Sequence, residues 1–223
     1  MTNQQTTRAP LPLTLPWSVP VLAEHARALL RPGTRHLLGL AGAPGAGKST
    51  LAAALCEALG PTAARVPMDG FHLANQVLRQ LGLAQRKGAP ATFDAGGFHA
   101  LLRRLRINNE EIVYAPEFFR ELEEPVAGAL PIPRDTELII VEGNYLLLDD
   151  GPWQGTAQLF DEVWYLRPDE TVRQDQLLRR HREHGRSAAE AEAWVAGNDE
   201  PNARVVASTA LRADKIIMPA GPG

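Results

Sequence analysis

Residues 42–49 combine closely spaced glycines with a lysine and a serine, a pattern that binds phosphate groups. They are Gly42, Ala43, Pro44, Gly45, Ala46, Gly47, Lys48 and Ser49, and they fit G-x-x-x-x-G-K-[ST]. Glycines adopt backbone angles that side chains forbid, so amide N–H groups can close around phosphate oxygens. We expect Lys48 to reach the β- and γ-phosphates of a nucleotide, the Ser49 hydroxyl to hold Mg²⁺, and Thr50 to complete the site.

The flanking segments supply the context that this pattern requires. His36–Ala41 is a short apolar run and predicts a buried strand, whereas Ser49–Leu59 is rich in alanine and leucine and predicts a helix. The helix would point its N-terminus, with its partial positive charge, at the bound phosphates. Chance would give on the order of 0.001–0.002 matches in a chain of this composition, before any demand on context. The sequence therefore predicts a nucleotide phosphate site.

Two acidic residues follow predicted strands and are candidates for chemistry at the same site. The Leu138–Val141 strand runs into Glu142, where a carboxylate can orient Mg²⁺ or its waters. The Ala64–Met68 strand runs into Asp69, whose carboxylate can orient a substrate hydroxyl and take its proton during attack on a γ-phosphate. The alternative role for Asp69 is to cap the helix predicted over Phe71–Leu81.

The densest positive patch lies on the helix predicted over Pro168–His184. Arg179, Arg182 and Arg186 would share one face if that helix continued through Gly185. We expect the first two to act in catalysis and the third to bind the nucleotide, as parts of a lid that neutralises phosphoryl charge and excludes water. The alternative is a solvated helix face whose arginines pair with acidic neighbours.

Short apolar strands alternate with helices along the chain, which indicates a parallel sheet covered on both faces. The remaining predicted elements are helices at Val21–Leu30, Phe98–Leu105 and Ala188–Ala196, strands at Glu162–Leu166 and Ile216–Met218, and a polar loop at Lys87–Gly97. Ligands bind at the carboxyl ends of the strands in such sheets. The phosphate loop, Asp69 and Glu142 should therefore meet at one edge of the sheet.

Composition limits the class of protein. The 223 residues suit one α/β domain, 44% of them are hydrophobic, and the formal net charge of −3 predicts no nucleic-acid or membrane partner. No apolar run is long enough to span a bilayer, and the single cysteine, Cys56, cannot form an internal disulfide. Met1–Pro16 are polar and proline-rich without the features of a secretory signal. We expect a flexible tail over residues 1–16, a kinase-like domain over 17–223 and a cytoplasmic location.

These features together resemble the uridine kinase, phosphoribulokinase and pantothenate kinase superfamily. The resemblance extends from about Leu37 to Met218 and is greatest for a bacterial subgroup described as nucleoside kinase-like or fructose-transport-system kinases. The matching stretches are residues 68–73, 86–90, 92–94 and 198–202. The resemblance implies an α/β fold of the P-loop NTPase type, a three-layer sandwich with a five-stranded parallel sheet and a helical lid. It also implies ATP and Mg²⁺ as cofactors and an alcohol group as the phosphate acceptor.

The resemblance further implies roles for individual residues, with Asp69 as the base. The residues that it places around the acceptor are Phe71, His72, Arg86, Lys87, Asp94, Phe118, Arg120 and Tyr145. Uridine kinases carry a Pro-x-Tyr-Asp stretch followed by a histidine that helps to hold the pyrimidine. Here the stretch is Pro-Glu-Phe-Phe at residues 116–119, and no histidine follows it closely. The acceptor, whether nucleoside, sugar or pantothenate-like, stays open.

A regulatory P-loop NTPase with a protein partner is the competing interpretation. A GTPase would carry Asn-Lys-x-Asp late in the chain, and residues 213–216, Ala-Asp-Lys-Ile, do not match it. A metallochaperone would carry clustered cysteines or histidines, whereas this chain has one cysteine and six scattered histidines. We therefore predict an ATP-dependent kinase of a small metabolite, and the sequence leaves open whether it forms a homo-oligomer.

Overall fold

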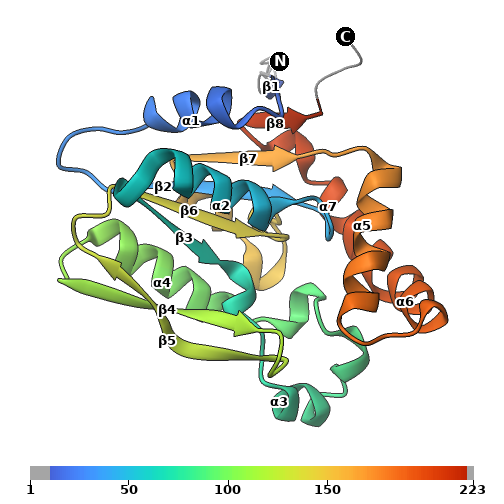
Figure 1. Ribbon diagram of the computed structural model, residues 1–223. Helices are drawn as coiled ribbons and strands as arrows, with labels where there is room; N and C mark the ends of the chain where they lie inside the picture. The colour runs from blue at the N-terminus through green and yellow to red at the C-terminus, as the bar shows by residue number, and fades with distance from the viewer. Residues whose placement is uncertain (1–10, 220–223) are drawn as a thin grey trace, which may run out of the picture.

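The computed structural model describes residues 11–219, which form a parallel sheet with helices on both faces (Figure 1). In spatial order the strands are β1 (Leu13–Pro16), β8 (Lys215–Met218), β7 (Glu162–Leu166), β2 (His36–Gly42), β6 (Leu138–Gly143) and β3 (Ala63–Pro67). All neighbouring pairs run parallel. Every residue of β2 and β6 is buried, as expected for central strands covered on two sides.

Alternate residues of the central strands build two separate cores. The helices that cover the two faces are α1 (Val19–Arg27) and α2 (Lys48–Leu59) on one side, and α4 (Ala95–Ile107) and α7 (Glu200–Ala207) on the other. Leu38 and Leu40 of β2 pack in the core with α1 and α2, whereas Leu37 and Ala41 pack in the core with α4. This division follows from the two-residue period of a strand.

The predicted fold class is confirmed, but the sheet has six strands rather than five. The additional strand is β1, whose four residues belong to the segment predicted as a tail over 1–16. It pairs with β8, and Leu15 is buried in the core beneath α1. Residues 1–10 of that predicted tail lie outside the described part of the chain. The ordered fold therefore begins before residue 17.

A hairpin that the sequence analysis did not predict lies beyond β3. It consists of β4 (Ile112–Phe119) and β5 (Glu124–Pro133), which pair antiparallel with an irregularity between Ala115 and Glu117. The four prolines at positions 116, 125, 131 and 133 hide its strand pattern, because proline within a run argues against a strand. The hairpin extends below the sheet beside α4 (Figure 1).

The helix predicted over Phe71–Leu81 is wrong at its start. The chain instead forms a 3₁₀ turn at Met68–Phe71, becomes extended, and enters α3 only at Asn75–Gln80. Backbone bonds to the following loop hold it extended, since Leu73 donates to the carbonyl of residue 92 at 2.9 Å and residue 94 donates to Phe71 at 2.8 Å. Asp69 therefore lies in a tight turn at the end of β3.

The lid is formed by α5 (Glu170–Glu183) and α6 (Ala188–Trp194), which stand beside the carboxyl edge of the sheet (Figure 1). A π-helix at Val195–Asp199 joins α6 to α7. The helix does not continue through Gly185, the condition under which Arg179, Arg182 and Arg186 would share one face, because that glycine has φ +91° and turns the chain. Between residues 11 and 219, no helix has the length and apolar character to cross a membrane.

We predict that Gly70→Ala destabilises the fold. A Cβ at this position would lie 2.4 Å from the carbonyl oxygen of Pro116 in β4, so the turn that carries Asp69 would have to move. The expected loss is about 1–3 kcal/mol of the free energy of unfolding, measured by urea denaturation. Gly96→Ala is the matched control, because its nearest neighbour would be an Asp94 oxygen at 3.6 Å. Equal stability of Gly70→Ala and the wild type would contradict this packing.

Candidate active site

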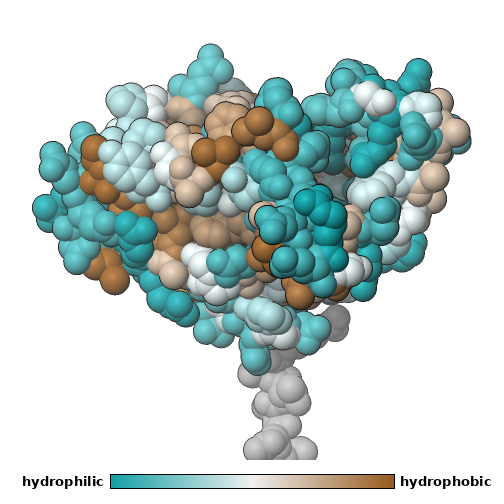
Figure 2. Space-filling model, turned by 90° about the horizontal axis from the view of Figure 1, so that it is seen from below, coloured by the Kyte–Doolittle hydropathy of each residue, from teal (hydrophilic) through white to brown (hydrophobic). Residues whose placement is uncertain are grey.

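A cleft of about 1420 Å³ opens at the carboxyl ends of β2, β3 and β6. Its walls come from the phosphate loop, the 3₁₀ turn after β3, the tip of the β4–β5 hairpin, and α5. The space-filling view shows the surface hollowed between the hairpin side and the lid side (Figure 2). Elements far apart in the sequence thus meet at the edge that the parallel sheet predicts.

The phosphate loop has the backbone that its glycines were expected to allow. Gly45 and Gly47 have φ +80° and +81°, and Gly47 caps the start of α2. A Cβ on Gly47 would lie 2.9 Å from the Trp17 indole, so the loop also has no room for a side chain there. Arg173 of α5 donates to the Pro44 carbonyl at 2.9 Å and holds the loop from the lid side.

The structure brings most of the loop to the cleft. The residues that line it are Pro44, Gly45, Ala46, Gly47, Lys48, Ser49 and Thr50, which all belong to the predicted set. Gly42 and Ala43 are buried and lie outside the cleft lining. A Cβ on Gly42 would lie 3.0 Å from a carbonyl oxygen of β7, so this glycine permits close packing of the loop on the sheet.

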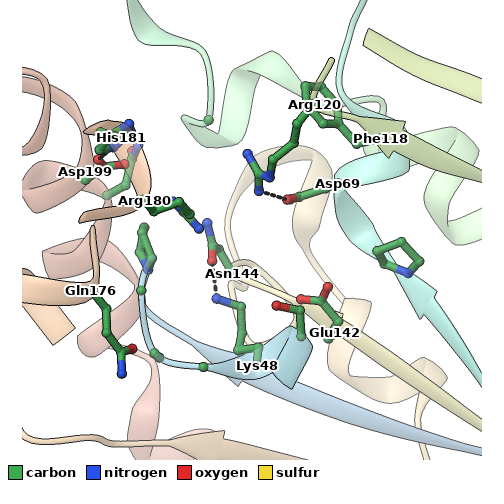
Figure 3. Close-up of a pocket in the computed structure, with 18 of the residues that line it drawn as sticks. Lys48, Asp69, Phe118, Arg120, Glu142, Asn144, Gln176, Arg180, His181 and Asp199 are labelled. Carbon is green, nitrogen blue, oxygen red and sulfur yellow. Dashed lines mark hydrogen bonds and ion pairs between the residues drawn. The ribbon is translucent and has the colours of Figure 1, made fainter. Parts of the chain in front are cut away.

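Lys48 points into the cleft and is held by two oxygens. Its ammonium donates to the Ala43 carbonyl at 3.0 Å and to the Asn144 side chain at 2.7 Å (Figure 3). Burial lowers the pKa of Lys48 to about 8, although the carboxylates of Glu142 and Asp69 oppose this shift. Asn144 was not predicted from the sequence. Its position two residues after Glu142, at the exit of β6, is the signal that could have identified it.

The two predicted carboxylates face the same space from different strands. Glu142 is buried, and burial together with the nearby charge of Asp69 raises the pKa of its carboxyl group. Asp69 is partly exposed and lies 4.0 Å from the guanidinium of Arg120 (Figure 3). Within residues 11–219 the Asp69 carboxylate makes no capping hydrogen bond, so the capping alternative finds no support.

The donor set fits Mg²⁺ bound together with a nucleotide. Magnesium in phosphate-transfer sites is held by one or two protein oxygens and by substrate phosphates. Ser49, in the first turn of α2, and Glu142, at the end of β6, supply such oxygens on the wall of the cleft. No group of three or more acidic, histidine or cysteine side chains is arranged for a metal in the described residues.

Aromatic and cationic side chains form the far end of the cleft. The Phe118 ring, from β4, lies 5.0 Å from the His72 ring and 4.9 Å from the Lys87 ammonium, measured between centres. Arg120 reaches over the same ring at 5.9 Å. Burial lowers the pKa of His72. Four predicted acceptor residues therefore converge here, from the hairpin and from the loop after β3.

The other four predicted acceptor residues do not line the cleft. Phe71 packs edge-on against an aromatic ring of the core, and Asp94 caps α4. Tyr145 is buried and its hydroxyl donates to the Gly88 carbonyl at 2.5 Å, so it supports the loop that carries Lys87. The fourth, Arg86, is exposed on the same loop. Sequence position alone could not separate such supporting residues from residues that face the cleft.

The lid arginine that enters the cleft is Arg180. Figure 3 shows it reaching toward Asn144 and Lys48, and burial lowers its pKa. Arg182 is exposed and lies outside the cleft lining. Arg179 lines the rim but is exposed and lies 3.5 Å from Glu183, as the solvated-face alternative expected for some arginines.

Arg180 was missed because the sequence does not show which face of α5 is turned toward the cleft. The buried residues of this helix are Arg173, Leu177 and His181, which lie at intervals of four. Arg180 lies three residues after Leu177 and so flanks that buried stripe, whereas Arg182 points away from it. Arg186 lines the cleft, and its guanidinium stacks on the Trp194 ring at 4.2 Å.

The chain is similar to known proteins over most of its length. The family model described as "Phosphoribulokinase / Uridine kinase family" matches residues 37–222. A Schizosaccharomyces pombe protein named "Putative uridine kinase C227.14" is 36% identical over 181 residues, which cover 77% of each chain. The "Uncharacterized protein YggC" of Escherichia coli is 34% identical over 194 residues, which cover 84% of this chain and 79% of that protein.

A solved structure extends the likeness to three dimensions. It is described as a "putative fructose transport system kinase" from Silicibacter sp. TM1040. Its TM-score is 0.80 at 38% identity, and the match covers 89% of this chain and 98% of that one. The likeness therefore covers most of the chain in sequence and in three dimensions.

We predict that Arg180→Ala and Arg182→Ala differ sharply in their effect on nucleotide binding. Removing Arg180 should weaken the binding of Mg·AMP-PNP about tenfold relative to Mg·ADP, because a charged donor facing the γ-phosphate is lost. Removing the exposed Arg182 should change this ratio less than about twofold. Isothermal titration calorimetry gives both affinities. Equal effects of the two substitutions would contradict the placement of Arg180.

Proposed function

The chain belongs to the phosphoribulokinase / uridine kinase family, and on that premise we propose that it transfers the γ-phosphate of ATP to a hydroxyl of a small metabolite. The observation that carries this proposal is the convergence of Lys48, Asp69 and Glu142 in one cleft. Each comes from the carboxyl end of a different strand of the sheet. The phosphate loop accounts for nucleotide binding, and the aromatic end of the cleft provides space for an acceptor.

The proposed residues have two tasks in the reaction, which are to position the acceptor hydroxyl and to neutralise the phosphate charge. Lys48 and Arg180 face the position of the β- and γ-phosphates, where donors stabilise the charge of a largely loose transition state. Asp69 accepts a hydrogen bond from the acceptor hydroxyl, orients its oxygen toward the γ-phosphate and receives its proton. Ser49 and Glu142 would hold Mg²⁺, which would neutralise phosphate charge when bound.

We propose a nucleoside or a sugar as the acceptor. The Phe118 ring offers a face on which a planar base or the apolar face of a sugar can stack. Arg120, Lys87 and His72 provide hydrogen-bonding groups around it. The names of the relatives, a uridine kinase and a fructose transport system kinase, suggest the same two classes as first candidates. A pantothenate-like acceptor is the alternative. We place the enzyme in the cytoplasm, without a nucleic-acid or membrane partner.

The proposed function is tested with a panel of acceptors. Purified protein is incubated with Mg·ATP and single nucleosides, hexoses, pentoses, glycerate or pantothenate, and ADP release is followed. At least one acceptor should raise ADP release well above the rate with water alone, and the product should carry one phosphate by mass spectrometry. Binding of Mg·ATP with no stimulation by any hydroxyl compound would favour a regulatory NTPase instead.

We predict that Asp69→Asn lowers kcat by about 100-fold or more, the usual scale for a positioned base. The affinity for Mg·AMP-PNP should stay within about threefold, because the carboxylate faces the acceptor rather than the phosphate loop. Steady-state kinetics and calorimetry measure the two quantities. Glu121→Gln, an exposed acid near the tip of the hairpin, is the control and should keep wild-type kcat. An unchanged kcat in Asp69→Asn would remove this residue from the mechanism.

We also predict that Lys48→Ala strongly reduces phosphoryl transfer, by at least about 100-fold in kcat/KM for ATP. The ammonium is the phosphate-loop cation that the cleft presents to the β- and γ-phosphates. Lys215→Ala is the matched control, since that lysine pairs with Glu162 on the sheet and lies outside the cleft lining. Normal turnover by Lys48→Ala would show that the nucleotide binds elsewhere.

A further inference from the structure

Three consecutive residues, Asn198, Asp199 and Glu200, contact the loop that carries Lys87 and two buried residues of α5. We call them the junction. They lie where the π-helix meets α7, in a stretch that the sequence analysis matched to a family pattern without assigning it a role. Asn198 and Asp199 are buried although their side chains are polar. Buried polar side chains need partners. The partner of Asn198 lies in the loop at residues 84–92, which we call the acceptor loop, and the partners of Asp199 and Glu200 lie on α5 of the lid.

The π-helix explains how neighbouring residues reach in separate directions. A π-turn inserts one residue into a helix and so shifts the face that each following side chain presents. Such turns are rare and are frequently found at functional sites. Here the π-helix at Val195–Asp199 is continuous with α6 before it and α7 after it. The junction is therefore a built feature of a continuous helical segment rather than a loose loop.

The first contact holds the acceptor loop. The Asn198 amide donates to the Lys87 carbonyl at 2.8 Å. The next residue, Gly88, has φ +100° and lies against the amides of Asn198 and Asn202, since a Cβ there would be 3.8 and 3.9 Å from them. Its carbonyl accepts from Tyr145 on the other side. The loop that carries the Lys87 ammonium toward the Phe118 ring is thus fixed from the lid.

The second contact holds the turn of α5 that carries Arg180. Asp199 lies 2.6 Å from Nε2 of His181, and Arg186 lies 2.5 Å from Nδ1 of the same ring. A guanidinium can only donate, so Nδ1 accepts and Nε2–H donates to Asp199. His181 is the neighbour of Arg180, and Figure 3 shows the His181–Asp199 pair behind the Arg180 side chain. This chain of bonds fixes the turn of α5 that aims Arg180 into the cleft.

The third contact reaches the phosphate loop. Glu200 forms an ion pair with Arg173, whose side chain is only 2% exposed. The same guanidinium pairs with Glu170 and donates to the Pro44 carbonyl at 2.9 Å. A buried arginine with this number of partners has little freedom to move without breaking several bonds. Arg173 therefore connects the phosphate loop to Glu200 through direct contacts.

We propose that the junction couples the nucleotide site to the acceptor loop and sets the position of Arg180. Asn198, Asp199 and Glu200 are positioning residues, because they act through Lys87, Arg180 and the phosphate loop. This inference rests on the proposed function for its meaning. Its physical content is that nucleotide at the phosphate loop stabilises the acceptor loop on the far side of the cleft. Such coupling requires one structural element whose conformation is affected by both sites. The junction contacts both the acceptor loop and, through Arg173, the phosphate loop.

A double-mutant cycle tests the link between Asp199 and Arg180 without any acceptor. The measured quantity is the ratio of the Kd values for Mg·ADP and Mg·AMP-PNP, obtained by calorimetry, which reports contact with the γ-phosphate. Asp199→Ala should lower this ratio by about five- to tenfold, and the double variant with Arg180→Ala should fall no lower than Arg180→Ala alone. If the double variant instead showed the product of the two single effects on this ratio, Asp199 and Arg180 would act independently and the proposed link would be overturned.

Matched variants separate positioning from loss of folding. Asp199→Asn keeps an oxygen that accepts from His181 and should recover most of the wild-type ratio, whereas a purely electrostatic role of Asp199 would give no recovery. Glu192→Ala, an exposed residue of α6, should leave the ratio unchanged. Thermal unfolding shows that each variant is folded. If Asp199→Ala is unfolded, the cycle is run with Asp199→Ser, and a ratio equal to wild type would refute the role of Asp199.

Hydrogen–deuterium exchange tests the link to the acceptor loop. In the wild type, Mg·AMP-PNP should slow amide exchange in residues 42–50 and also in residues 84–92. In Asn198→Ala, the first segment should stay protected by nucleotide, whereas the second should lose its response and exchange faster even without nucleotide. Equal protection of residues 84–92 in both proteins would overturn the proposal. If nucleotide did not protect residues 42–50 in the wild type, the proposed function would be overturned instead. In that case, faster exchange of residues 84–92 in nucleotide-free Asn198→Ala would still support the role of the junction in holding this loop.

Discussion

The parallel register of β2, β6 and β3 is the constraint on which the site depends. Leu40 of β2 and Pro67 of β3 both stand opposite Glu142 of β6, so the three strands end at the same level. Backbone hydrogen bonds fix this register along almost the whole length of each strand, and both faces of β2 and β6 are buried. The phosphate loop, the turn of Asp69 and the Glu142 carboxylate therefore emerge side by side, without any direct bond that holds the three together.

Charges gathered at this edge are stabilised poorly by the protein alone. Burial lowers the pKa values of Lys48 and Arg180 and raises that of Glu142, so each group is disfavoured in its charged form. Opposed shifts of this kind within one cleft are frequent at functional sites. In the proposed function, a magnesium–triphosphate complex supplies counter-charges to both kinds of group, so its binding stabilises the folded cleft.

In the proposed function, recognition of the acceptor is separated from the sheet. The hairpin contributes Phe118 and Arg120 to the cleft, and the loop after β3 contributes His72 and Lys87, whereas the proposed phosphate-binding groups lie at the end of the sheet. Segments outside the regular core tolerate change more easily, which lets one phosphate-transfer edge serve different acceptors. The π-helix of the lid contacts the acceptor side and the phosphate side alike, through Asn198 and through Glu200 by way of Arg173.

Local signals are sufficient to predict the phosphate loop, the central strands and the two strand-end acids: glycine backbone requirements, short apolar runs and the residue that follows each run. Which arginine of α5 enters the cleft depends on how the stripe of Leu177 packs, so it follows only from the tertiary structure. The edge strand β1 likewise forms by pairing with the distant β8, whereas the β4–β5 hairpin pairs locally and its prolines hide its strand pattern. The contacts of Asn198 and Asp199 span 111 and 18 residues of chain, and no local pattern encodes such distances.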